Sequence, residues 1–149
     1  MKTQVQQFCE KHGACSDGAK FARQFPTLAE VYDACPRGDW LWWMIRKGGF
    51  ADKILSVKVA IACAEHVLPV FEKRFPDDDR PRRAIQAAKD FLDGKITAAS
   101  AAAYAADAAA YAASAAAYVA AYAAADATYA EPQRQADKIR ELVGRNPFV

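Results

Sequence analysis

The chain has 149 residues, with 20 Lys and Arg against 18 Asp and Glu and a formal net charge of +2. A chain of this length can build one domain with a sizeable core and no crosslinks. The balanced charge excludes the strongly basic composition typical of nucleic-acid-binding proteins. We therefore expect a single domain over residues 1–149 and no nucleic-acid partner.

Signal-peptide, membrane-span and cysteine patterns in the sequence indicate the compartment in which we expect the protein. The first residues, Met1 to Gln7, have no apolar core of the kind a signal peptide needs. A long Ala-rich segment could cross a bilayer by length alone, but Asp107 and Asp126 and the weak hydrophobicity of alanine argue against it. The four cysteines fit free thiols in a reducing compartment. We expect a cytoplasmic protein with no membrane partner.

Capping and helix-ending residues divide the first third of the chain into short helices. Thr27 and Glu30 fit a capping box. Asp39 is a favourable N-cap for a helix from Trp40 to Lys47, which Gly48-Gly49 closes. The other expected helices cover residues 2–11 up to Gly13, residues 17–24 from a Ser16 cap to Pro26, and the stretch from Thr27 to Cys35-Pro36.

The remaining signals are also helical. We expect a long helix from Asp52 to about Arg74, with a kink at Pro69. Further helices are expected from Pro81 to Leu92, stopped by Gly94, and from Gln133 to Val143, after a break at Pro132 and before Gly144. No window alternates with the period of two that marks a strand. The fold class is therefore all-α, a single-domain helical bundle with one long Ala-rich helix.

That Ala-rich segment runs from Thr97 to Ala130 and contains 22 alanines and five tyrosines in 34 residues. Alanine has the best intrinsic helix propensity, so nothing local interrupts a helix here. The tyrosines are Tyr104, Tyr111, Tyr118, Tyr122 and Tyr129. At about 100° per residue they fall within roughly 40° of one another around a helix. We interpret the segment as a bent, nearly continuous framework helix whose tyrosine stripe is a packing face.

The densest cluster of informative residues is Cys35-Pro36-Arg37-Gly38-Asp39-Trp40-Leu41-Trp42-Trp43. In a purely structural interpretation Asp39 caps a helix, Trp40 and Trp43 pack inward, and Trp42 is partly exposed. In a functional interpretation the same residues also form a recognition surface, because Trp and Arg are enriched at interface hot spots. A pair between Arg37 or Arg80 and a carboxylate could tie the Pro76–Pro81 loop to this turn, or the polar cluster could meet a partner.

Several of these segments resemble the bacterial immunity proteins of the Imm5 type. The resemblance covers about Val31 to Leu142. It is carried by the hexapeptide Cys35 to Trp40, Arg80-Pro81 followed by Ala84-Ile85-Gln86-Ala87-Ala88, Leu92-Asp93-Gly94, the Ala-rich helix, and Gln135-Ala136-Asp137 with Arg140. It implies an all-α protein that neutralises a toxin of a polymorphic toxin system. Related copies occur in phage and mobile elements. The family's characteristic Trp, Asp and Arg correspond to Trp40, Asp39 and Arg80.

The cysteines and histidines allow two other hypotheses. Cys9-x2-His12-x2-Cys15, Cys63-x2-His66 and Cys35 are soft ligands, but they lack the paired knuckles of a zinc site. Cys35 with either histidine has no local signature of a nucleophile and base. Asp77-Asp78-Asp79 has neither the Gly nor the bidentate Glu of a calcium loop. We expect no metal, no cofactor and no catalytic residue, so the protein is predicted not to be an enzyme.

The sequence thus favours a non-catalytic binding protein that neutralises a partner toxin by occlusion. The residues expected to meet that partner, or to form the polar cluster behind it, are Arg37, Asp39, Trp40, Trp42 and Arg80. Two alternatives stay open. One is a phage or mobile-element inhibitor of a bacterial defence effector; the other is a helical structural module that assembles into a homo-oligomer through the tyrosine stripe.

Overall fold

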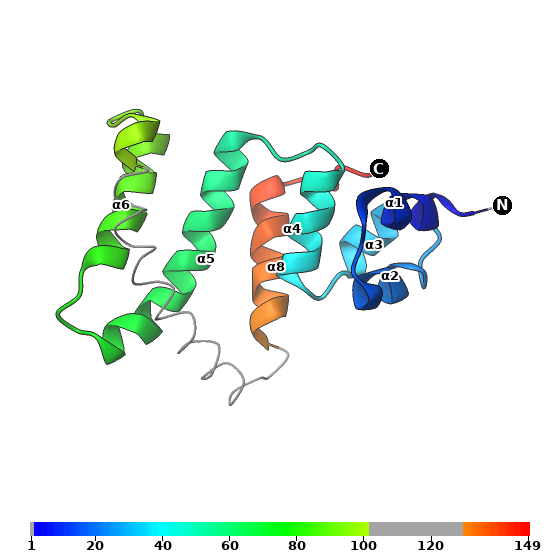
Figure 1. Cartoon of the computed structure of the whole chain (residues 1–149), viewed down its shortest axis with the longest axis horizontal. Helices are drawn as coiled ribbons and strands as arrows, with labels where there is room; N and C mark the ends of the chain where they lie inside the picture. The colour runs from blue at the N-terminus through cyan, green and yellow to red at the C-terminus, as the bar shows by residue number, and fades with distance from the viewer. Residues whose placement is uncertain (1, 102–129) are drawn as a thin grey trace. The chain divides into compact units, whose positions relative to one another are not determined.

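The computed structural model describes residues 2–101 and 130–149, and every regular element in these ranges is an α-helix (Figure 1). The helices are α1 (Gln4–His12), α2 (Ser16–Ala22), α3 (Leu28–Ala34), α4 (Gly38–Lys47), α5 (Lys53–Arg74), α6 (Arg80–Leu92) and α8 (Ala130–Val143). The described residues contain no strand, which confirms the all-α fold class. The expected helix and tyrosine stripe of the Ala-rich segment fall outside the described residues. At the start of that segment, the Thr97 hydroxyl accepts a hydrogen bond from the Ser100 N–H.

The chain divides into two compact units, each described here by itself. One unit contains residues 1–52 and 129–149, and the other contains residues 53–128. That the whole chain forms one domain stays a prediction.

Within the described helices, no single one is long and apolar enough to cross a membrane. The bent pair Lys53–His66 and Leu68–Arg74 passes that test together on length and composition.

Helix starts in the first unit follow local capping chemistry, with one correction. Thr3 and Gln6 form a complete capping box at α1, which ends at Gly13 in the left-handed conformation. Thr27 caps α3 by accepting from the Glu30 N–H at 3.2 Å, which confirms the Thr27 half of the predicted capping box. The expected Ser16 cap is wrong: α2 begins at Ser16, and the Cys15 sulfur accepts the Gly18 N–H at 3.4 Å. A thiol therefore takes the place of the more usual hydroxyl.

The start of α4 also differs from the prediction. Asp39 is not the N-cap, because the helix already begins at Gly38 and the N-cap position is Arg37, which has no side-chain capping bond. Asp39 lies in the first turn, where a negative charge still interacts favourably with the helix dipole. Its carboxylate is taken up by the Arg37 guanidinium instead. The predicted end at Gly48-Gly49 is confirmed, with Gly49 at φ 81°.

The core of this unit lies between α4 and α8, which run side by side in Figure 1. Leu41 and Ile45 of α4 are fully buried, as is Ala136 of α8. The two helices approach closely at Gly38, where an added Cβ would lie 2.5 Å from the Gln135 Cβ. Only glycine permits this contact. Pro132 lies within the described helix α8, so the expected start at Gln133, after a break at Pro132, is wrong.

The second unit contains α5 and α6, which pack against each other. Their predicted bounds are confirmed to within a residue, including Pro81 in the first turn of α6 and a left-handed Gly94 after it. The two segments of α5 on either side of Val67 are bent by 42°, as the internal Pro69 predicts. Two ion pairs join the helices, Lys89 with Glu65 at 2.6 Å and Arg82 with Glu72 at 2.7 Å.

Candidate functional site

The turn between α3 and α4 is held in place from the far end of the chain. Arg140 of α8 donates to the Tyr32 carbonyl at 2.8 and 3.2 Å and to the Cys35 carbonyl at 2.6 Å. These carbonyls belong to the end of α3, where backbone acceptors lack partners within the helix. The Arg140 guanidinium is 5.8 Å from the centre of the Tyr32 ring, and its side chain is 21% exposed. Arg140 therefore caps α3 and fixes the backbone from which Arg37 and Asp39 project.

At the surface of this turn Arg37, Asp39 and Trp40 form one cluster. The Arg37 guanidinium donates two hydrogen bonds to the Asp39 carboxylate, at 3.0 and 2.7 Å. It also lies over the Trp40 ring, 4.6 Å from the ring centroid. The two hydrogen bonds from Arg37 lower the pKa of Asp39, against the opposing effect of partial burial. The Arg37 side chain is 48% exposed and the Asp39 side chain is 58% exposed. The pair is therefore held in one geometry but remains open to solvent.

The three tryptophans of α4 point to different surroundings. Trp40 packs on Phe21 and Trp43 on Phe8, with ring centroids 5.9 Å apart in each pair. Both rings thus pack on neighbouring helices, but like Trp42 they remain partly exposed, so the predicted contrast in burial among the three tryptophans is not seen. Trp42 is partly exposed and borders a different hollow. The helix consequently presents aromatic surface on two of its faces.

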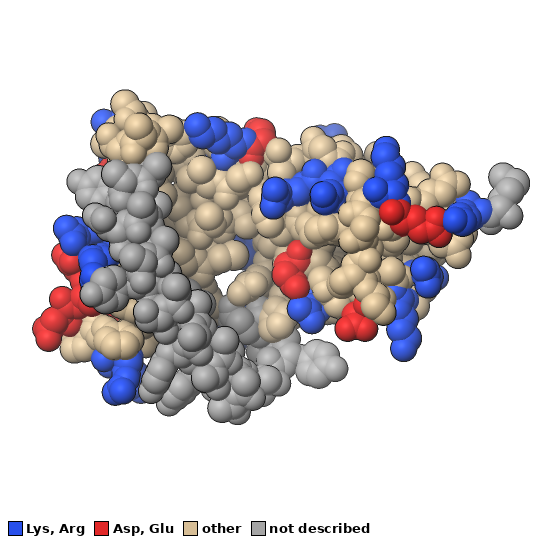
Figure 2. All heavy atoms as spheres, viewed as in Figure 1, with Lys and Arg blue, Asp and Glu red and all other residues tan. Residues whose placement is uncertain are grey.

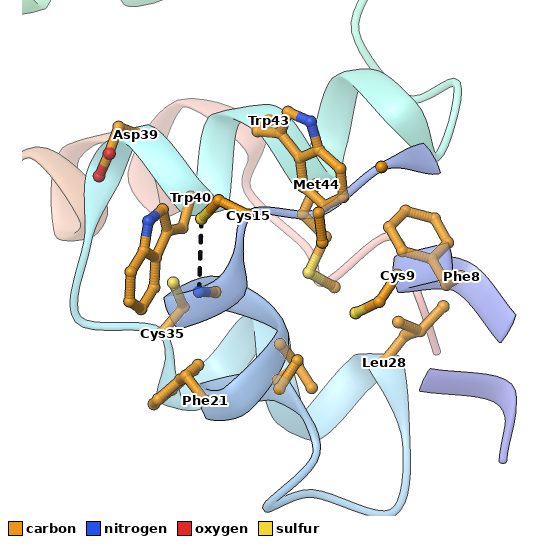
Figure 3. Close-up of a pocket in the computed structure, with 15 residues that line it drawn as sticks. Phe8, Cys9, Cys15, Phe21, Leu28, Cys35, Asp39, Trp40, Trp43 and Met44 are labelled. Atoms are coloured by element: carbon orange, nitrogen blue, oxygen red, sulfur yellow. Dashed lines mark hydrogen bonds between the residues drawn. The ribbon is translucent and has the colours of Figure 1, made fainter. Parts of the chain in front are cut away.

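The Trp40 and Trp43 rings line a pocket of about 300 Å³ formed by α1 to α4 (Figure 3). Its walls are mostly apolar, and Asp39 is the charged side chain among the described lining residues. The walls comprise Phe8, Cys9, Gly13, Ala14, Cys15, Gly18, Phe21, Ala22, Leu28, Val31, Cys35, Asp39, Trp40, Trp43 and Met44. A concave apolar site with few polar groups is the usual form of a binding pocket.

Three of the four cysteines face this pocket, as Figure 3 shows for Cys9, Cys15 and Cys35. Burial raises the pKa of the Cys9 and Cys35 thiols, so both are protonated at neutral pH. The Cys35 thiol donates to the Arg37 carbonyl at 3.4 Å. Protonated, hydrogen-bonded thiols are poor nucleophiles and poor metal ligands. Within the described ranges, no three His, Cys, Asp or Glu side chains could hold one metal ion.

A second hollow of about 410 Å³ adjoins the pocket on α4. It is lined by Asp39, Trp42, Trp43, Arg46 and Lys47. It shares Asp39 and Trp43 with the apolar pocket, so the two hollows meet at these side chains. On the face that Figure 2 shows, Lys and Arg side chains are interspersed with Asp and Glu rather than gathered in a stripe.

Arg80, the remaining predicted site residue, belongs to the other unit. Its guanidinium donates to the Asp78 carboxylate at 2.7 and 2.6 Å, and its backbone N–H donates to the same carboxylate at 3.1 Å. These bonds lower the pKa of Asp78. The arrangement orders the loop that leads into α6. Arg37 and Arg80 thus each pair with a carboxylate two positions away, and the structure describes them in separate units.

Sequence reasoning missed the two features that shape this site. One is Arg140, whose carbonyl partners are 105 and 108 positions earlier in the chain. The other is the pocket itself, whose walls come from four helices. The only local signal was the spacing of Phe8, Phe21, Trp40 and Trp43 on the apolar faces of their helices, and no single-helix pattern shows that these faces enclose a space.

Comparison with known proteins gives one match. A family model described as "Imm-5 like putative immunity protein" matches residues 50–137, which is more than half of the chain. The search of curated proteins and the search of solved structures each return no match. The matched residues include Arg80, the Ala-rich segment and the first part of α8. The hexapeptide from Cys35 to Trp40 and the other two tryptophans precede the matched range.

Proposed function

The chain belongs to the Imm-5 like putative immunity protein family, and from this membership we propose that it neutralises a protein toxin by binding it. The binding is stoichiometric and occludes the toxin without turnover. The proposed site of action is the cytoplasm, because a toxin that acts inside cells would be bound there. The same binding role would serve a phage-encoded inhibitor whose target is a defence effector.

The observation that carries the proposal is the fixed pair of exposed side chains Arg37 and Asp39 next to Trp40 and Trp42, which are both partly exposed. Arg and Trp are the side chains most often found at interface hot spots. Arg37 is already held over Trp40 by its two bonds to Asp39. A partner that contacts it therefore pays less side-chain entropy on binding than one that contacts an unrestrained arginine.

The chemistry of the described residues supports a binding role. The Cys35 thiol is buried and protonated, which does not suit a nucleophile. The Asp78 and Asp39 carboxylates are each engaged by an arginine, which holds the pKa of both groups low, whereas a general acid needs a raised pKa. Multiple turnover of any substrate by the pure protein would overturn this part of the proposal.

The experiment is co-expression with a candidate toxin chosen from the genes next to the one that encodes this chain. The wild-type protein should protect the cells. The double variant Arg37→Ala with Trp42→Ala should lose protection at normal protein levels. The matched control is Arg134→Ala, which removes an exposed arginine from α8. Protection by the double variant at wild-type abundance would remove this face from the proposal, and failure of the wild type against the toxin would reject the immunity function.

A further inference from the structure

The two hollows on α4 differ in chemistry although they share a border. Trp40, Trp43 and Met44 face the apolar pocket, whereas Trp42, Arg46 and Lys47 line the second hollow. Asp39 and Trp43 belong to both. A partner segment that lies across α4 would therefore meet an apolar cavity and a basic, aromatic surface next to each other.

The apolar pocket is large enough to take an uncharged ring. Its volume is about 300 Å³. An apolar cavity of about 150 Å³ already holds a benzene molecule, so an aromatic side chain fits here with room to spare. The Asp39 carboxylate at its edge is neutralised by Arg37, and the Cys9 and Cys35 thiols are protonated. A charged group placed here would lose its hydration without gaining an ionic partner.

The neighbouring hollow has the opposite preference. Counted with Arg37, it carries three cations and one carboxylate, Asp39, which leaves a net charge of +2. The ion pairs of the described residues use Arg37 for Asp39 but do not include Arg46 or Lys47. Both cations are exposed in the last turn of α4. They are available to an incoming carboxylate.

We propose that the toxin partner docks on α4 through an acidic segment that carries an aromatic side chain. The ring enters the apolar pocket, and the carboxylates beside it meet Arg46 and Lys47. This inference rests on the proposed function, because it names the chemistry of the partner's contact. An aromatic anchor in a pocket, flanked by complementary charge, is the arrangement that concentrates binding energy at protein interfaces.

The probe is a blocked five-residue peptide with a central phenylalanine between two pairs of aspartates, added to the full chain at low salt. Its binding should change the emission of the tryptophans, all of which lie in α4. It should also slow alkylation of Cys15 in proportion to occupancy. Cys63 in α5 is not among the pocket residues and is the internal control.

Two control peptides separate the parts of the contact. Replacing the central phenylalanine by alanine should weaken binding at least about thirtyfold, the effect of losing one hot-spot side chain. Replacing the aspartates by asparagines should weaken binding about tenfold and remove its salt dependence. Equal binding of all three peptides would overturn the proposal.

Variants of the protein test the same surface from the other side. Ala14→Leu fills the pocket from a partly exposed loop position, and Ala34→Leu adds the same side chain at an exposed position that does not line the pocket. Arg46→Gln with Lys47→Gln removes the cations, with Lys58→Gln in α5 as its control. We expect lost binding for each test variant and unchanged binding for each control. The peptide series on the wild type stands even where a variant fails to fold.

Co-expression with the toxin distinguishes failure of this inference from failure of the proposed function. Protection by the wild type and equally by Ala14→Leu would overturn the aromatic anchor while the immunity function stands. Peptide binding with no protection by the wild type would reject the toxin as the target while the preference of α4 for an acidic, aromatic segment stands. Loss of protection by Ala14→Leu but not by Ala34→Leu is the result we expect.

Discussion

Replacement of Arg140 by methionine should destabilise the unit that contains α4 by about 3 kcal/mol. The change keeps most of the aliphatic stem and removes the guanidinium that donates three hydrogen bonds to the Tyr32 and Cys35 carbonyls. Hydrogen bonds to a charged group are each worth about 1.5–3 kcal/mol. One guanidinium makes all three bonds and its side chain is 21% exposed, so we expect a total near the value of one or two such bonds.

Urea unfolding followed by tryptophan emission measures this effect directly, because the emission comes from α4 alone. Arg134→Met is the matched control on the same helix, where the side chain is exposed, and it should change the free energy of unfolding by less than about 0.5 kcal/mol. Arg140→Lys should fall between the two, since an ammonium lacks the planar fork that reaches two carbonyls. Equal free energies of unfolding for Arg140→Met and Arg134→Met would refute the capping role of Arg140.

Three further substitutions probe the same turn. Gly38→Ala should cost about 1–3 kcal/mol by urea unfolding, because its Cβ would lie 2.5 Å from the Gln135 Cβ and force α4 and α8 apart; an unchanged midpoint would contradict this close approach. Asp39→Asn should cost at most about 1 kcal/mol at pH 7, since the pair is exposed. Arg37 lowers the pKa of Asp39 in the folded state, so the pair stabilises the fold above the ordinary carboxyl pKa, and this contribution is lost as the pH falls through the lowered pKa. The free energies of unfolding of Asp39→Asn and the wild type should therefore converge at a pH below the folded-state and unfolded-state pKa of Asp39. A constant gap between the two proteins would argue against an ionic contribution. Cys15→Ala should cost about 0.5–1 kcal/mol through loss of the α2 cap, whereas Cys15→Ser should not, as thermal melts can show.

The predictable part of the fold is the part that depends on local chemistry. Thr27, Pro81, Gly13 and Gly94 begin or end helices for reasons contained within one helical turn, and the structure places them as the sequence predicts. The errors at Ser16 and Asp39 have the same origin. In each case a neighbouring side chain competes, Cys15 for the cap of α2 and Arg37 for the carboxylate of Asp39. Choosing between adjacent capping residues requires backbone torsion angles that sequence does not specify.

The site depended on contacts that no local pattern contains. Arg140 reaches the end of α3 across more than a hundred residues, and Gly38 is required by the close approach of Gln135 on another helix. Both residues were visible in the sequence, as a basic residue near a helix end and as a glycine in a turn. Neither identity indicates its partner, because many arginines and glycines occur in such positions without a tertiary role.

We expect the cluster at the start of α4 to contribute more to binding than to folding, and the geometry gives the reason. Arg37 and Asp39 are about half exposed, so their mutual attraction is screened and adds little stability. Their two hydrogen bonds nevertheless fix the guanidinium over the Trp40 ring. A partner then meets an arginine whose rotamer freedom is already reduced, beside a pocket whose backbone frame is held by Arg140. Loss of Arg140 should weaken both folding and binding, whereas loss of Arg37 should weaken binding at nearly unchanged stability. A variant of Arg37 that melts as early as Arg140→Met would contradict this division of roles.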